Sequence, residues 1–314
     1  MKNSPLVSII TVNYNQESVT ADFLKSLSLL TYSNFEVIVV DNGSANPSAG
    51  LMKQFPFITH ITSPQNIGFA GGNNIGLQYA KGEYVFFINN DTIVTPKVLS
   101  VLVDYLQKNE QCGIVCPKIK YHWQPDTIQY AGAVGLHPVT CRSYDIGYLQ
   151  KDDGRFDDAR KTDLPNGAAM LVPMKLIETL GGMSELFFLY YEELDWAARF
   201  LKAGYEIHYA GTASILHKES VSTGKNSPFK TFYLYRNRLL YIRRNYNGWK
   251  RIISATFFTL VSIPVHSARH IFKGEFKHIF SIAKALTWHL WHKPFKEPFI
   301  NSSTLKNQLM IDSA

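Results

Sequence analysis

The sequence predicts an α/β fold, with a mostly parallel central sheet and helices on both of its faces. In the first 110 residues, short runs of β-branched and aromatic residues alternate with longer segments whose apolar residues recur at helical spacing. Strands that are joined through helices pair in parallel, and the sheet they build is buried on both faces. Three of the short runs also end in polar residues, which is typical of the ligand-binding edge of such a sheet.

Local patterns predict each element in turn. The run LVSIITV predicts a strand at 6–12, and FEVIVVD predicts a second at 35–41, closed by the turn Asn42-Gly43-Ser44. Between them, a helix at 17–30 is indicated by the helical spacing of Val19, Phe23, Leu24, Leu27 and Leu30. The remaining elements are a short strand at 58–62, a helix at 71–80, a strand at 83–88 and a helix at 96–108, where Pro96 suits the first turn.

Size and composition indicate a globular protein. The chain has 314 residues, of which 46% are hydrophobic, so it can bury a large core. Cys112, Cys116 and Cys141 match neither a disulfide framework nor a zinc pattern, and we expect them to be buried apolar residues in a reducing compartment. The first residues, MKNSPLVSIITVNYNQ, have only a short apolar run and no small-residue cleavage site, so we expect no signal peptide and a cytoplasmic location.

The net charge of +7 is unevenly distributed. Residues 225–300 contain 14 Lys and Arg against 2 Asp and Glu, a net +12, whereas residues 1–224 contain 17 against 22, a net −5. We therefore predict an α/β domain at 1–225, a basic helical segment at 226–300 and a flexible tail at 301–314. No zinc-finger, RNP or helix-turn-helix signature accompanies the basic segment, so we expect no nucleic-acid partner.

Polar side chains follow three of the predicted strands. Asn13 comes after the first strand and Asp41 closes the second. Asn89, Asn90 and Asp91 follow the strand that ends in FFI. In parallel sheets the ligand crevice lies outside the carboxyl ends of the strands. We therefore expect these polar residues to converge on one binding crevice.

Six segments together carry a resemblance to a known family. In chain order they are VSIITVNYN, VIVVDNGS, NIGFAGGNNIGLQYAKGEYVFFINND, LPNGAAMLV, GGMSELFFLYYEELDWAARFLKAGY and ILHKESVSTG. They resemble the motif series of family 2 glycosyltransferases with the A-type fold, in the branch that includes rhamnosyltransferases. The resemblance covers about residues 5–245. It implies an inverting enzyme that uses a nucleotide-sugar donor and Mg²⁺ or Mn²⁺.

The resemblance also implies where a donor, a dTDP- or UDP-sugar, would bind. Asp41 falls where the family holds the pyrimidine base, and the alternative is that its carboxylate only closes the following turn. The glycine-rich segment 66–76 lacks P-loop and dinucleotide-binding signatures, so it either approaches the donor closely or makes a tight helix start. The predicted donor-binding residues are Tyr14, Asn13, Asp41, Asn66, Gly68, Asn74, Asn89 and Asn90.

The segment NNDT falls where the family has its metal-binding Asp-x-Asp motif. Two carboxylates that flank one position can share Mg²⁺ or Mn²⁺, with phosphate oxygens and waters as the other ligands. This chain has Asn89 in place of the first Asp. The resemblance therefore implies that Asp91 carries the charge, with His217 as its partner on the metal or the diphosphate.

The segment FFLYYEELDWAARF contains the predicted catalytic base. In the family the second acidic position of the pair is the base, which corresponds to Glu193, and Glu192 is the alternative. Apolar neighbours precede the pair, and burial among them would raise a carboxylate pKa toward a useful value. Asp195 is expected to pair with Arg199 at i,i+4 spacing. The alternative is a solvated acidic first turn.

The basic segment predicts contact with a membrane surface. The apolar run at 252–265 has 14 residues, fewer than the roughly 20 that a helix needs to cross a bilayer. Residues 270–295 mix Lys and His with Phe, Ile, Leu and Trp, which favours peripheral association with the inner face of the cell membrane. The alternative is a basic helix that packs on the catalytic domain or on a second copy of the chain, in a homo-oligomer.

These features predict a glycosyltransferase that acts on a hydroxyl of a saccharide or lipid-linked saccharide in surface polysaccharide synthesis. The alternative is a catalytically silent, membrane-associated saccharide-binding subunit, which the missing first Asp of the metal motif would permit. A nucleotidyltransferase is disfavoured, because TVNYNQES near the first strand contains no Lys or Arg.

Overall fold

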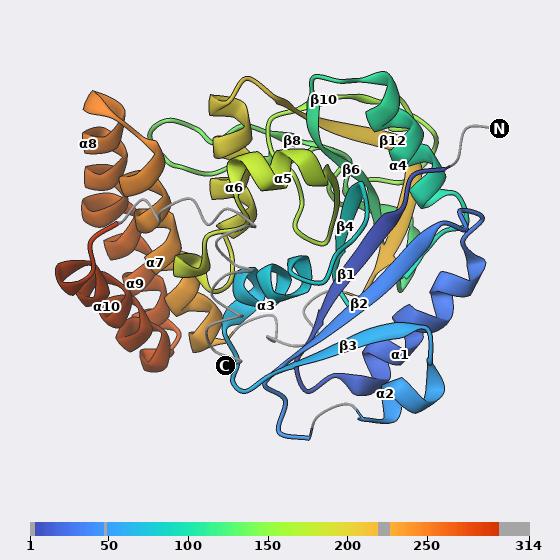
Figure 1. Ribbon diagram of the computed structural model, residues 1–314. Helices are drawn as coiled ribbons and strands as arrows, with labels where there is room; N and C mark the ends of the chain where they lie inside the picture. The colour runs from blue at the N-terminus through green and yellow to red at the C-terminus, as the bar shows by residue number, and fades with distance from the viewer. Residues whose placement is uncertain (1–3, 47–48, 219–226, 295–314) are drawn as a thin grey trace.

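The computed structural model describes residues 4–46, 49–218 and 227–294 (Figure 1). The predicted tail at 301–314 lies outside these residues, as does part of the ILHKESVSTG segment. The strands are β1 Val7–Asn13, β2 Phe35–Asn42, β3 Ile58–Ser63, β4 Tyr84–Ile88, β5 Thr92–Val94, β6 Cys112–Tyr121, β7 Gln124–Tyr130, β8 Ala133–Val134, β9 Tyr144–Asp145, β10 Arg160–Thr162, β11 Ala169–Pro173 and β12 Glu206–His217.

One ten-stranded sheet dominates the molecule. Its order is β10-β12-β6-β11-β4-β1-β2-β3, with β5 beside β12 and β7 beside β6, while β8 and β9 form a separate pair. The strands β3, β2, β1 and β4 pair in parallel, which confirms the predicted arrangement of the N-terminal half. Beyond β4 the sheet is mixed, because β11 runs antiparallel to both β4 and β6.

Helices cover both faces of the sheet. They are α1 Glu17–Ser26, α2 Ala49–Gln54, α3 Gly68–Leu77, α4 Val98–Lys108, α5 Met174–Leu180, α6 Glu192–Lys202, α7 Pro228–Asn245, α8 Gly248–Phe257, α9 Ile263–Phe272 and α10 Phe276–Trp291. Figure 1 shows α3, α5 and α6 on the side of the sheet that faces the C-terminal helices, and α1 and α2 on the other side. The structure thus has the layered α/β architecture that the sequence predicted.

Three helices differ from their predictions at their boundaries. The helix expected at 96–108 begins as α4 at Val98, so Pro96 precedes its first turn. The helix expected at 17–30 ends as α1 at Ser26 and continues as a 3₁₀ turn over Leu27–Leu29. The helix expected at 71–80 begins three residues earlier, at Gly68. Gly68 has a φ of +82°, and a Cβ there would lie 2.2 Å from the carbonyl oxygen of Phe188, so only glycine fits this helix start.

The main hydrophobic core lies on the two faces of the sheet, and a second core joins the C-terminal helices to the α/β domain. Cys112, Cys116 and Cys141 are buried free thiols, as expected from the sequence. The second core contains Leu239, Leu240, Tyr241 and Ile242 of α7, Phe258, Ile263 and Ile282 from later helices, and Cys141 and Phe187 from the α/β domain. Because these side chains share one core, α7 packs directly on the segment that precedes α6.

The C-terminal apolar run belongs to a longer helix than the sequence indicated. The elements α8 and α9 are joined by a π-helical turn, Phe258–Ser262, into one continuous helix. This helix, Gly248–Phe272, has 25 residues and a mean hydropathy of 1.2, and it is the one helix among the described residues that is long and apolar enough to cross a membrane. By length and composition this helix could cross a bilayer, so the expectation that the region is too short to span is wrong.

Candidate active site

Three strand ends meet in a buried hydrogen-bond network, as predicted. At the end of β1, Asn13 Nδ2 donates to Asp41 Oδ2 at the end of β2, over 3.1 Å. Thr20 Oγ1 of α1 donates to Asn13 Oδ1 (3.0 Å) and accepts from Asn90 Nδ2 (2.9 Å), which follows β4. Asp41 Oδ1 also accepts from the backbone N–H of Ser44 (2.9 Å), so this carboxylate closes the turn after β2 as well. One network therefore spans β1, β2 and β4.

Asp91 and His217 form a second pair beside this edge. His217 Nε2 lies 3.0 Å from Asp91 Oδ1, and the two residues are 7% and 8% exposed. The other ring nitrogen, Nδ1, lies 2.8 Å from Oε1 of Gln129 on β7. Because an amide oxygen only accepts hydrogen bonds, this contact places a ring proton on Nδ1 and leaves Nε2 facing Asp91.

This pair fits a divalent cation. The buried atom Asp91 Oδ1 has no hydrogen-bond partner, and two electron-pair donors at 3.0 Å repel each other unless a cation or a proton lies between them. Among the described residues, no group of three or more His, Cys, Asp and Glu is arranged to hold a metal ion. The chain would thus supply two ligands, and a diphosphate and waters the others, as is typical of Mg²⁺.

The loop before α6 has a strained backbone. Phe188, Tyr190 and Tyr191 have φ angles of +62°, +69° and +75°, a region that residues with a Cβ rarely adopt. Each such residue costs of order 1–3 kcal/mol, and strain of this kind is concentrated at functional sites. Because Tyr191 is the N-cap of α6, the strained backbone leads directly into Glu192 and Glu193.

Glu192 and Glu193 carry poorly solvated carboxyl groups. Both lie in the first turn of α6, and Oε2 of each is buried without a hydrogen-bond partner. Burial raises the pKa of Glu192 well above its ordinary value, and the adjacent Glu193 raises it further. Burial, with a contribution from Asp145, raises the pKa of Glu193 to about 7. A carboxyl that titrates near neutral pH can take a proton from a hydroxyl, as a general base must.

The turn before β11 lies between the acidic pair and the polar end of β4. The backbone N–H of Asn89 donates to the carbonyl of Ala168 over 3.0 Å. One residue earlier, a methyl group added to Gly167 would lie 3.7 Å from the carboxyl carbon of Glu193. Asn89, at the polar end of β4, and the expected base Glu193 therefore both border this one backbone turn.

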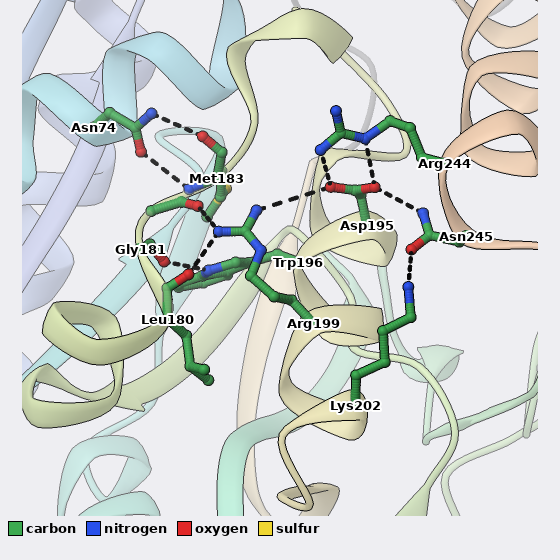
Figure 2. Close-up of polar contacts among 11 residues, drawn as sticks. Asn74, Leu180, Gly181, Met183, Asp195, Trp196, Arg199, Lys202, Arg244 and Asn245 are labelled. Atoms are coloured by element: carbon green, nitrogen blue, oxygen red, sulfur yellow. Dashed lines mark hydrogen bonds and ion pairs between the residues drawn. The ribbon is translucent and has the colours of Figure 1, made fainter. Parts of the chain in front are cut away.

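Asp195 has a different main partner from the predicted one. Arg244 of α7 forms a bidentate ion pair with it, in which Nε donates to Oδ1 (3.0 Å) and Nη2 donates to Oδ2 (3.1 Å) (Figure 2). Asn245 Nδ2 also donates to Oδ1, over 2.7 Å. The predicted pair with Arg199 is also present, with Nη2 3.8 Å from Oδ2, and Nη1 of Arg199 donates to the carbonyls of Leu180 and Gly182. Asp195 thus ties α6 to α7 and is not part of a solvated acidic turn.

The predicted donor-binding residues of the glycine-rich segment make contacts within the protein. Asn66 Oδ1 accepts from the backbone N–H of Gly68 (2.9 Å). The next residue, Phe69, donates its N–H to the carbonyl of Phe188 over 2.6 Å. The segment is therefore a tight helix start that packs on the strained loop. Donor contacts of Asn66 and Gly68 stay a prediction.

Asn74 and Tyr14 occupy contrasting positions. The Asn74 amide donates to the carbonyl of Met183 (2.8 Å) and accepts from the N–H of Met183 (3.1 Å) (Figure 2). It also donates to Glu185 Oε1 (2.9 Å). It thus fastens α3 to the segment before the strained loop. Tyr14, directly after β1, is 40% exposed and has a face available to a ligand. Asn89 is half-buried at the end of β4.

Several residues of the site were not found from the sequence. Thr20 and Gln129 have common side chains inside regular elements, and nothing in their surroundings distinguishes them. Arg236, Asn237 and Arg244 belong to the run YRNRLLYIRRN, where they were counted only as basic or polar residues. A signal was present, because apolar and basic residues alternate around the whole helix, and a helix without a polar face is often buried on most sides.

The profile of the family described as glycosyl transferase family 2 matches residues 8–164, half of the chain. The chain belongs to glycosyl transferase family 2. This confirms the family that the six motif segments resemble.

Relatives of this family 2 glycosyltransferase align over most of its length. The N-acetylglucosaminyl-diphospho-decaprenol L-rhamnosyltransferase of Mycobacterium tuberculosis is 24% identical over 273 residues, covering 78% of this chain and 87% of that protein. The dTDP-rhamnosyl transferase RfbF of Shigella flexneri is 25% identical over 297 residues, covering 88% and 94%. The solved mannosyltransferase PcManGT of Pyrobaculum calidifontis, in complex with GDP-Man and Mn²⁺, is 15% identical with a TM-score of 0.57, covering 100% and 82%. That likeness confirms the A-type glycosyltransferase fold.

Proposed function

We propose that this family 2 glycosyltransferase is an inverting enzyme. It transfers a hexosyl or deoxyhexosyl group from a nucleoside diphosphate to a hydroxyl of a saccharide or lipid-linked saccharide. The observation that carries the proposal is the buried carboxyl oxygen Oε2 of Glu193, which has no hydrogen-bond partner and lies by the backbone turn that borders the polar end of β4. Glu193 takes the proton of the acceptor hydroxyl as its oxygen attacks the anomeric carbon, and the nucleoside diphosphate leaves from the opposite face.

The proposed donor is a dTDP- or UDP-sugar. The carboxylate of Asp41 is an acceptor suited to the ring N–H of thymine or uracil. Tyr14, on the adjacent strand end and 40% exposed, offers an aromatic face to the base. The name of the RfbF relative, a dTDP-rhamnosyl transferase, supports the same nucleotide class.

The proposed cofactor is Mg²⁺ or Mn²⁺, held by Asp91 and His217. When bound, such a cation neutralises negative charge on the leaving diphosphate. Gln129 keeps the proton of His217 on Nδ1, and this holds Nε2 available as a ligand. The buried amide of Asn90 donates to Thr20 and carries no charge. We therefore assign it to holding the conformation of this edge of the sheet and not to binding the cation.

The C-terminal helices support a membrane-surface location for the enzyme, on the cytoplasmic face. Residues 225–300 have a net charge of +12, and anionic lipid attracts basic segments by about 1 kcal/mol per Lys or Arg near the surface. Apolar side chains are exposed over the same helices. They include Trp249, Ile252, Ile253, Leu260, Val261, Val265, Ile271, Phe272, Phe276, Phe280, Leu290 and Trp291.

A groove between α7 and α10 supports an acceptor that carries a lipid chain. Its volume is about 460 Å³, and it is lined by Pro228, Phe229, Phe232, Tyr233, Phe280, Ser281, Lys284, Thr287, Trp288 and Trp291. The ring of Phe188, in the strained loop, stacks on Tyr233 in the wall of this groove, with 4.9 Å between centroids. A prenyl chain in the groove would therefore bring its saccharide end to the segment that carries Glu193. The name of the M. tuberculosis relative includes a diphospho-decaprenol acceptor.

The test has two steps: a screen for the nucleotide-sugar donor, and a transfer assay of a variant that lacks the proposed base. A panel of dTDP-, UDP- and GDP-sugars is screened by thermal shift, in which a donor at 100 times its Kd adds about 2.7 kcal/mol to the free energy of unfolding. Transfer by Glu193→Gln is then compared with that of Glu178→Gln, the same change at an exposed site on α5. We expect Glu193→Gln to bind the donor normally and to lose 10²–10⁴-fold in transfer.

The other outcomes are distinct. If Glu192→Gln loses transfer and Glu193→Gln does not, the base is the other member of the pair. If neither variant loses transfer, the proposed mechanism is wrong. A protein that binds donors but neither hydrolyses nor transfers them, with or without Mn²⁺, would be the silent saccharide-binding subunit, which Asn89 in place of a metal-binding carboxylate favours.

A further inference from the structure

Asn237 of α7 holds the strained loop by its backbone. Its side chain is fully buried, and Nδ2 lies within hydrogen-bond distance of the carbonyls of Phe187 (2.8 Å), Leu189 (2.7 Å) and Tyr190 (2.7 Å), which share its two protons. Three carbonyls so close in sequence can face one nitrogen because the backbone turns into the positive-φ region at Phe188 and again at Tyr190. A single amide thus satisfies the acceptors that the unusual loop conformation turns inward.

Arg236 fixes the orientation of that amide. Its Nε donates to Asn237 Oδ1 over 2.7 Å, so the amide nitrogen, and not the oxygen, faces the loop. Its Nη2 donates to the carbonyls of Leu186 (2.8 Å) and Phe187 (2.5 Å). The guanidinium is buried against aromatic rings of α7 and α10, at 4.7 and 4.9 Å from their centroids. The two side chains therefore form one rigid unit against the loop.

The same loop is held on its other side by α3. Phe69 donates its N–H to the carbonyl of Phe188 over 2.6 Å. Farther along α6, Asp195 is bound by Arg244 and Asn245 of α7 (Figure 2). The first turn of α6 is therefore anchored to α7 through Asp195, and Asn237 contacts the backbone of the residues that precede the acidic pair.

We propose that Asn237, oriented by Arg236, is a positioning residue for sugar transfer. It holds residues 187–191 in the conformation that directs the carboxyl groups of Glu192 and Glu193 into the site. The inference rests on the proposed function and adds to it a residue of the basic C-terminal segment. Without the amide, the carbonyls of Leu189 and Tyr190 lose this contact, whereas that of Phe187 keeps Arg236, and the loop relaxes toward negative φ and turns the start of α6. A displacement of about 1 Å at a reacting group can lower a rate by about 100-fold.

The test separates positioning from folding. Asn237→Ala removes the amide, and Arg236→Lys keeps the charge but removes the planar donor that orients the amide. The matched control is Asn245→Ala on the same helix, whose amide binds Asp195 and not the loop. For Asn237→Ala we expect native circular dichroism, a donor Kd within about threefold of wild type, and a kcat for transfer lowered about 10- to 100-fold. Arg236→Lys should show a smaller loss in the same direction, and Asn245→Ala should retain kcat.

A pH profile adds a readout that a purely structural role would not change. The limb of the kcat/KM profile that reports the base should move in Asn237→Ala, because the loop sets the burial of Glu193 next to Glu192, Asp145 and Arg236. The limb should stay in place in Asn245→Ala.

Failure of the inference is distinguishable from failure of the proposed function. If Asn237→Ala is folded and transfers at the wild-type rate while Glu193→Gln does not transfer, positioning is refuted and the function stands. An equal loss in Asn245→Ala would also refute it, because the effect would then belong to α7 packing in general. If Asn237→Ala does not fold, Arg236→Lys decides, and wild-type transfer by that variant overturns the inference. Normal transfer by Glu193→Gln refutes the function itself.

Discussion

His217 Nε2 faces Asp91 Oδ1 across 3.0 Å, with its Nδ1 held by Gln129. This contact joins a histidine at the end of β12 to the residue that precedes β5, because His217 lies opposite Thr92 in the pairing of β12 with β5. Two buried side chains are thus brought together from distant parts of the chain.

The first prediction concerns this pair. Asp91→Asn removes the only carboxylate of the NNDT segment, so we expect it to abolish most transfer and the metal dependence of donor binding. Titration of Mn²⁺ into the protein with a nucleoside diphosphate measures this, and Asp104→Asn, an exposed change on α4, is the control. Full activity of the wild-type enzyme in EDTA would contradict the prediction.

The second prediction is a pH dependence of stability that Glu193 causes. The pKa of Glu193 is raised to about 7 in the folded protein, above the ordinary 4.5, so the folded state binds more protons than the unfolded state between these values. This stabilisation is complete below pH 4.5 and is lost as the pH rises through 7. Relative to wild type, Glu193→Gln should therefore gain stability between pH 5 and pH 8, by up to about 3 kcal/mol.

Urea unfolding at both pH values measures the effect, with Glu178→Gln as the exposed control. A stability difference between Glu193→Gln and wild type that does not change with pH would show that the carboxyl is not desolvated.

The third prediction concerns the bond between α6 and α7. Arg244 and Asp195 are both largely buried, with side chains 11% and 4% exposed, and Arg244→Met leaves a buried carboxylate with weaker partners. We expect the free energy of unfolding to fall by about 3 kcal/mol. Lys25→Met, which breaks the exposed pair with Asp22, should cost less than about 1 kcal/mol. Equal losses in urea unfolding would contradict the burial argument.

The fourth prediction concerns the membrane surface. Phe272 and Trp291 are 92% and 83% exposed on the C-terminal helices, so replacing both by Ser should leave the fold intact and weaken binding to anionic vesicles by tenfold or more. Trp123→Ser, a change at a 76% exposed residue outside these helices, is the control. Flotation at two salt concentrations measures the binding. Unchanged binding of the double variant would indicate that these helices contact protein and not lipid.

The edge of the sheet that β1, β2 and β4 form could be predicted from the sequence. Their apolar runs are consecutive and joined by helices, and the parallel register places Asn13 opposite Asp41. The start of α3 was misplaced because it depends on the close approach of Gly68 to Phe188, a contact between residues far apart in the chain. Local propensity carries no information about such a contact.

Local patterns could not predict the mixed half of the sheet or the contacts between α7 and the loop that precedes Glu192 and Glu193. The pairing of β12 with β5 and β6 brings together residues with large sequence separation and includes register shifts. Only the family resemblance suggested that His217 belongs with Asp91. The role of Asn237 was not predicted, because its partners are backbone carbonyls. Every residue has a backbone carbonyl, so no sequence pattern indicates such a contact.

The place of α7 in the chain sets an order of events during synthesis. A nascent chain leaves the ribosome from its N-terminus at about 5–20 residues per second. The strands that bear Asn13, Asp41 and Asn90 emerge first, whereas Asn237, which closes the loop around Glu193, emerges much later. The polar edge of the sheet is thus available for assembly before the loop that precedes Glu193 is held, and under the proposed function a newly made chain becomes competent for sugar transfer only when the C-terminal helices have also been made.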